Sequence, residues 1–60
     1  MDPEKALRDF IDAIDRGDTD DAIYCARDIE RWIQNGGFRP HGYQERAKSI
    51  QEWSRRKPTY

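Results

Sequence analysis

The sequence predicts an all-α fold, a small three-helix bundle in which an antiparallel helical hairpin packs against a third helix. Three segments carry apolar residues at the spacing of one helix face. Glycine, asparagine and proline separate these segments, and no stretch alternates strictly between apolar and polar residues as a half-buried strand would. We therefore expect one helical domain over residues 1–60, with helices at about 3–16, 20–34 and 42–56 and a flexible tail at 57–60.

The first predicted helix has a start signal, an apolar face and a stop signal. Asp2 is a good N-cap, and Pro3 suits the first helical position because an amide hydrogen there would have no partner in the helix. Gly17 can adopt the left-handed conformation that commonly ends a helix. The apolar side chains between them follow the i, i+3, i+4, i+7 spacing: Leu7, Phe10, Ile11 and Ile14.

The second predicted helix begins after Asp18 or Thr19, either of which can cap it, and ends at the run Asn35–Gly37. Ile23 lies on the flank of its apolar stripe. The stripe itself has helical period over three turns: Ala22, Cys25, Ala26, Ile29, Trp32 and Ile33. Because the connection between the first two segments is so short, we expect them to form an antiparallel hairpin.

The third predicted helix follows a linker at 38–42 in which Phe38 is the one apolar anchor. Pro58 ends the segment. Its apolar residues are Tyr43, Ala47, Ile50 and Trp53. We expect this helix to fold back over the apolar face of the hairpin and cover Leu7, Phe10, Ile14, Ile29 and Ile33.

The turn between the first two segments, Gly17-Asp18-Thr19-Asp20-Asp21-Ala22-Ile23, resembles the interhelical turn of a tetratricopeptide repeat. The resemblance covers this turn and the start of the second helix, and it implies hairpin geometry. Elsewhere the chain departs from the repeat: Phe10 stands where a small residue is usual, and Gln34 where a closing proline is usual. Repeats of this kind need about three copies to bury their faces, whereas this chain has one hairpin and an extra helix.

Composition narrows the classes of protein to be considered. Cys25 is the only cysteine, which excludes an intrachain disulfide and suits a reducing compartment. No apolar run approaches the roughly 20 residues that cross a bilayer, and the first residues carry no apolar signal-peptide core. We therefore expect a small soluble cytoplasmic protein that does not associate with membranes.

Charge is distributed unevenly along the chain. Residues 1–30 hold ten acidic and four basic side chains, a net charge of −6. Residues 31–60 hold two acidic and seven basic side chains, a net charge of +5. Such asymmetry can steer an oppositely charged partner, and it can also favour pairing between two copies of the chain.

The sequence predicts no enzyme, no cofactor and no metal site. Cys25 and His41 are its only thiol and imidazole, and no third residue is indicated that would orient them for catalysis. The acids around Asp18 lack the spacing of a calcium-binding loop, because the fifth position is Ala22 and the glycine precedes the acids. Capping of the second helix explains these acids, and core packing explains Cys25.

Aromatic and arginine residues near the end of the second helix and the start of the third predict an interaction module. Tryptophan, tyrosine and arginine are enriched at protein–protein hot spots. The predicted partner-binding residues are Trp32, Phe38, Arg39, Tyr43 and Arg46, and the partner is another protein or a second copy in a homodimer. Whether Trp32 belongs to this surface or to the core is left open by the pattern.

The alternative function is nucleic-acid binding through the basic third helix and tail, by Arg46, Lys48, Arg55, Arg56 and Lys57. Cations neutralise phosphates, and the aromatic side chains interspersed with them could stack on bases. Against this, Glu45 and Glu52 interrupt the basic stretch, and the chain as a whole has a net charge of −1. Nucleic-acid-binding domains usually carry a clear positive excess.

Overall fold

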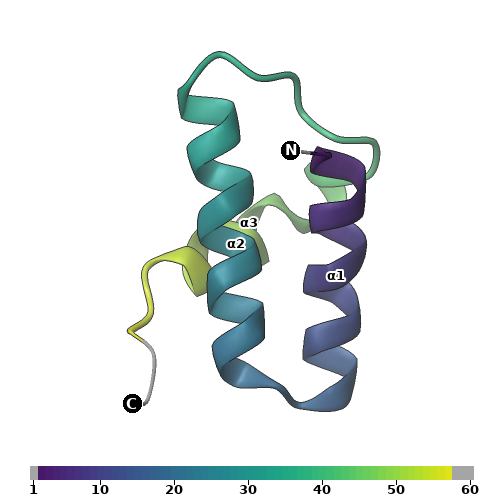
Figure 1. The fold of residues 1–60 in the computed structure, drawn as a ribbon, viewed down its shortest axis with the longest axis vertical. Coiled ribbons are helices and arrows are strands. Elements are labelled where there is room, and N and C mark those ends of the chain that lie inside the picture. Colours follow the sequence, from purple (N-terminus) through teal and green to yellow (C-terminus); the bar gives the residue numbers. More distant parts are fainter. Residues whose placement is uncertain (1, 58–60) are drawn as a thin grey trace.

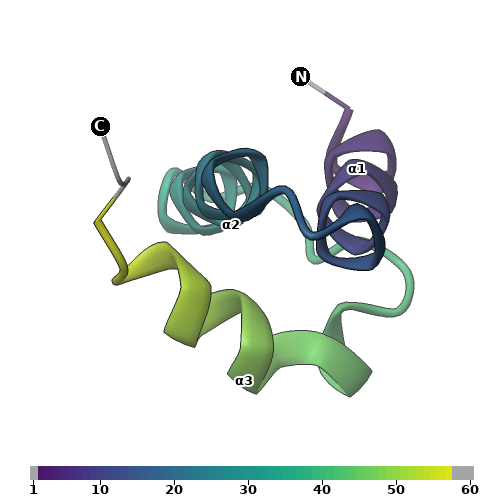
Figure 2. The same ribbon diagram turned by 90° about the horizontal axis from the view of Figure 1, so that it is seen from below.

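The computed structural model describes residues 2–57, and these form three α-helices: α1 (Pro3–Arg16), α2 (Thr19–Gln34) and α3 (Tyr43–Ser54). Helices α1 and α2 lie side by side and antiparallel, and α3 crosses one face of this hairpin (Figures 1 and 2). Within the described residues there is no strand. The predicted all-α three-helix arrangement is confirmed, while the predicted tail at 57–60 lies outside the described residues except for Lys57.

Side-chain caps set the ends of the hairpin helices where the sequence predicted them. The Asp2 carboxylate accepts a hydrogen bond from the Glu4 amide at 3.0 Å, with Pro3 in the first turn of α1. Gly17 is left-handed, with φ at 74°, and reverses the chain after α1. The Asp18 carboxylate then accepts from the Asp21 amide at 3.2 Å, so of the two predicted caps Asp18 is the N-cap of α2 and Thr19 is its first residue.

Helix α3 is shorter than predicted, because it runs over 43–54 in place of 42–56. Its last carbonyl groups are bound by a side chain from another helix. Arg27 of α2 donates from Nε to the Ser54 carbonyl at 3.3 Å and from Nη2 to the Arg56 carbonyl at 2.8 Å. These two hydrogen bonds, which local sequence pattern does not predict, attach the end of α3 to α2.

Helix α2 is the central element of the core, since it packs against both α1 and α3. A helix with two neighbours must bury a wide sector of its surface, and Ile23, predicted on the flank of the stripe, is only 1% exposed. Besides Pro3, the residues buried across the three helices are Leu7, Phe10, Ala13, Ala22, Ile23, Ala26, Ile29, Tyr43 and Ile50. The small side chains of Ala13, Ala22 and Ala26 allow the helices to approach closely.

Ile14, expected in the core, and Phe38, expected as the anchor of the linker and as a partner-binding residue, both lie at the surface. Ile14 is 38% exposed because α3 crosses the hairpin at an angle and does not cover its turn end. Phe38, expected as an anchor, is 63% exposed. By contrast, Ile33 and Trp53 are partly buried and pack against the core cluster. No helix among the described residues combines the length and apolar composition that a membrane span requires.

Candidate interaction surface

The chain between α2 and α3 crosses the end of the hairpin opposite the α1–α2 turn (Figure 1). Trp32, in the last turn of α2, holds this loop by its backbone. Its indole Nε1 donates to the Phe38 carbonyl at 2.8 Å. The two rings also meet edge to face, with centroids 5.7 Å apart and planes at 89°. This is a favoured aromatic geometry, and it positions the Phe38 ring beside the indole.

Gly37 makes the approach of the Trp32 ring possible. A Cβ atom at this position would lie 2.3 Å from Cε2 of Trp32, which is far inside van der Waals contact. The indole therefore packs directly on loop backbone that carries no side chain. From the sequence, residues 35–37 were predicted only to end the second helix. Apolar periodicity does not predict that the Trp32 ring packs on the backbone of Gly37.

The far end of the loop is fastened to α1 and to the start of α3. The His41 amide donates to the Glu4 carboxylate at 3.3 Å, and Pro40 is buried. The Tyr43 amide donates to the Pro40 carbonyl at 3.0 Å. The loop is thus attached to all three helices and holds Phe38 in a defined position.

Phe38 and Arg39 point a large apolar ring and a cation into solvent next to each other. At 63%, Phe38 is the most exposed large hydrophobic residue in the described part of the chain. The Arg39 guanidinium lies 5.9 Å from the centroid of the Tyr43 ring, within cation–π range. An open hollow of about 350 Å³ adjoins Arg39 and is lined by residues 39–45.

The five predicted partner-binding residues have different positions in the structure. Trp32 is partly buried and supports Phe38, which answers the question that the sequence left open. Tyr43 is 5% exposed, so its ring belongs to the core and its hydroxyl donates to Glu30 at 3.4 Å. We therefore remove Tyr43 from the contact residues. Arg46 is exposed on the first turn of α3. Its role as a contact residue stays a prediction. Trp32, Phe38 and Arg39, which are in contact or adjacent in sequence, form a surface that is called the Phe38 surface below.

The five predicted nucleic-acid-binding residues do not share one face. At about 100° per residue, Arg46 and Lys48 point roughly 160° apart around α3. Glu52 lies on the outward side between them and pairs with Arg56 at 3.5 Å. The Arg56 guanidinium also stacks 3.9 Å from the centroid of the Trp53 ring. Arg55 and Lys57 are exposed at the end of α3.

Cys25 is partly buried on α2 in surroundings that disfavour its ionised form. Burial, followed by the negative charge of nearby Asp21, raises the pKa of the Cys25 thiol from 9.0 to about 11. A thiol is nucleophilic only when ionised, so Cys25 is a poor nucleophile at neutral pH. In the part of the chain that the structure describes, no three His, Cys, Asp or Glu side chains are grouped so that they could hold a metal ion.

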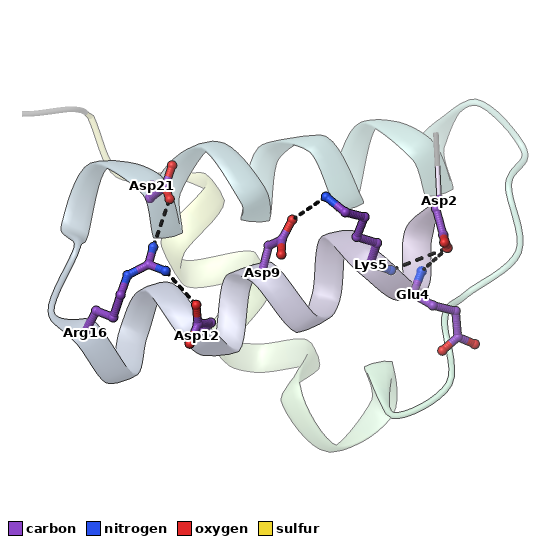
Figure 3. A network of polar contacts seen from close by, with 7 residues as sticks. All are labelled: Asp2, Glu4, Lys5, Asp9, Asp12, Arg16 and Asp21. Carbon is purple, nitrogen blue, oxygen red and sulfur yellow. Dashed lines mark hydrogen bonds and ion pairs between the residues drawn. The ribbon is translucent and has the colours of Figure 1, made fainter.

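The outer surface of the hairpin is charged and carries exposed ion pairs (Figure 3). Near the α1–α2 turn, the Arg16 guanidinium contacts Asp12 within α1 and Asp21 of α2, the latter at 3.1 Å. Asp18 lies 3.8 Å from the same guanidinium. Such solvent-exposed pairs add little to stability, and one arginine leaves the turn region acidic.

No protein-family model, curated protein or solved structure matches this chain.

Proposed function

We propose that this protein is a non-catalytic interaction module that binds a protein partner through the Phe38 surface. One observation carries the proposal. Phe38 is 63% exposed, while its own carbonyl is held by the Trp32 indole at 2.8 Å. An apolar side chain with most of its surface in solvent buries little area within the fold, whereas it is well suited to insertion into a partner.

Fixing the loop in advance favours binding. Association normally costs conformational entropy when loops and side chains become ordered, and a loop already attached to α1, α2 and α3 avoids part of this cost. Burying a phenylalanine side chain contributes about 1.5–3 kcal/mol. Arg39 beside it can pair with a carboxylate at the rim of the contact. The Phe38 surface thus combines an apolar anchor with an adjacent charge.

A protein partner fits this surface better than a nucleic acid. Phe38, the most exposed large hydrophobic residue in the described part of the chain, has one neighbouring cation in sequence, Arg39. The cations of α3 diverge around the helix and alternate with Glu45 and Glu52. Strong binding to a phosphate backbone requires several cations on one surface.

Affinity capture from source lysate, with and without nuclease, tests the proposal. Phe38→Ser removes the anchor, and Tyr24→Ser is the matched control because it removes another exposed ring, 43% exposed, from α2. We expect partners to persist after nuclease treatment, to weaken about tenfold or more with Phe38→Ser, and to be unchanged with the control. Binding that nuclease abolishes, or that Phe38→Ser leaves intact, would contradict the proposal.

A further inference from the structure

A second apolar feature lies at the opposite end of the hairpin. Ile14 is 38% exposed and lines the same hollow as Trp53, which lies near the end of α3. Together with the turn they line a shallow hollow of about 50 Å³, called the turn hollow: Ala13, Ile14, Gly17, Asp18, Thr19 and Trp53. Its lining includes the apolar side chains of Ala13, Ile14 and Trp53 and the acidic side chain of Asp18.

The two ends of the hairpin differ in charge. Residues 12–21 hold five aspartates and one arginine, a net charge of −4, and Arg56 on the Trp53 ring adds one positive charge near the turn hollow. Residues 31–46 hold three arginines and one glutamate, but the fold also brings Glu4 and Glu30 to this end, so it is close to neutral. The exposed cation of Arg39 beside the Phe38 ring is therefore complementary in charge to the acidic residues around the turn hollow.

We propose that the turn hollow receives the Phe38 ring of a second copy of this chain, with Arg39 of that copy facing the acidic turn. This inference rests on the proposed role of the Phe38 surface and names its partner. Each copy supplies a ring at one end and a hollow at the other, so neither site is complete without a neighbour.

The geometry makes the contact head-to-tail. The two features are separated by the length of α1, roughly 20 Å at 1.5 Å per residue over 14 residues, so a molecule cannot fill its own hollow. Such a contact can be made twice across a two-fold axis, which closes a dimer, or once with each of two neighbours, which builds a chain or a ring. The hollow is shallow and takes the edge of the ring between Ile14 and Trp53. The assembly is therefore weak and depends on protein concentration.

Sedimentation velocity on the full chain and on two variants tests this arrangement. Phe38→Ser removes the ring and keeps the hollow. Ile14→Arg places a cation in the hollow and keeps the ring. Both positions are exposed, and equal helical circular dichroism confirms folding. Thr19→Arg, at an exposed position on the rim, is the second blocking variant if Ile14→Arg fails to fold.

The unmodified chain should form dimers or larger assemblies as its concentration rises, and its association should weaken in about 0.5 M salt, where screening is strong. Each variant alone should be monomeric, with association lowered about tenfold or more. An equimolar mixture of the two variants should form dimers and stop there, because only one intact contact remains possible.

Three results would overturn the inference: an unmodified chain that stays monomeric at millimolar concentration, self-association that Phe38→Ser leaves unchanged, or a mixture that stays monomeric. The outcome is separable from that of the proposed function. If the chain is monomeric but still captures another protein in a Phe38-dependent way, only the head-to-tail contact fails.

Discussion

Replacing Gly37 by alanine should push the Trp32 indole off the loop and destabilise the protein. The new Cβ would lie 2.3 Å from Cε2 of the ring, and the ring can rotate away because it ends a side chain. The loss in unfolding free energy is then limited to the stabilisation that the indole provides in its present position. That contribution is about 1 kcal/mol for the bond to the Phe38 carbonyl and about 0.5–1.5 kcal/mol for the edge-to-face contact.

An opposing effect lowers this cost. Alanine restricts the unfolded chain more than glycine does, which stabilises a protein by about 0.4–1 kcal/mol where the backbone tolerates it. The net loss in unfolding free energy is therefore about 1 kcal/mol, or about 5 °C in the melting temperature of so small a domain. In a Trp32→Ala background the clash is gone, and Gly37→Ala should stabilise the protein. The sign of the effect reverses between the two backgrounds.

Urea denaturation followed by far-ultraviolet circular dichroism measures all four members of this double-mutant cycle. A temperature of about 15 °C suits the measurement, because small domains are most stable near there. Gly36→Ala is the matched control. Its φ of 91° disfavours any Cβ by about 1–2 kcal/mol, and its Cβ would meet no atom within 4 Å, so its cost should be equal in both backgrounds. Equal destabilisation by Gly37→Ala in both backgrounds would refute the reasoning.

Three further experiments test other features of the structure. Asp18→Ala removes the N-cap of α2 and should lower the unfolding free energy by about 1 kcal/mol in urea titrations, whereas Asp18→Asn, which keeps a capping oxygen, should cost much less. Arg27→Met should release the carbonyls of Ser54 and Arg56. Amides in the last turn of α3 should then exchange with deuterium faster, while those of α1 should not. Faster exchange throughout the protein would contradict this local role. Because the pKa of the Cys25 thiol is raised to about 11, less thiolate is present at pH 8, and Cys25 should react with iodoacetamide about 100-fold more slowly than in the unfolded chain. The reaction rate should keep rising as the pH increases through 10. A rate that levels off below pH 9 would show that Cys25 is an ordinary thiol.

The helices of the hairpin could be predicted because local chemistry decides where they begin and end. Asp2, Gly17 and Asp18 act through hydrogen bonds and backbone angles within a few residues, which a sequence displays directly. The end of α3 was predicted two residues too late, since the carbonyls there are satisfied by Arg27 from another helix. Periodicity carries no information about such a contact.

The packing angle of α3 was the main feature that periodicity could not supply. Apolar spacing identifies a buried face, but it does not say how the covering helix crosses it. For this reason Ile14 was expected in the core and lies partly exposed, while Ile23 was placed on a flank and is buried. One signal was available: Ile23 directly follows Ala22 and widens the stripe of α2 beyond what a single neighbouring helix requires.

The candidate surface could be predicted only in part. Composition drew attention to Trp32, Phe38, Arg39 and Tyr43, and the first three do lie at the surface or support it. Tyr43 was misplaced because its spacing fits a core position and a contact residue equally well. The bond from the Trp32 indole to the Phe38 carbonyl depends on the missing side chain of Gly37, a three-residue arrangement with no periodic signature.

Because the loop that carries Phe38 is attached to α1 and α2, binding at Phe38 would raise the stability of the fold. The bond between His41 and Glu4 ties the loop to the first turn of α1, and Trp32 ties it to the last turn of α2. A partner bound to Phe38, as proposed, would therefore also stabilise the end of the hairpin that the loop covers. By mass action, a ligand at 100 times its dissociation constant adds about 2.7 kcal/mol to the folded state. In a 60-residue chain the core alone supplies only about 3–5 kcal/mol of stability. The fraction of molecules with the Phe38 surface occupied would therefore strongly affect the fraction that is folded.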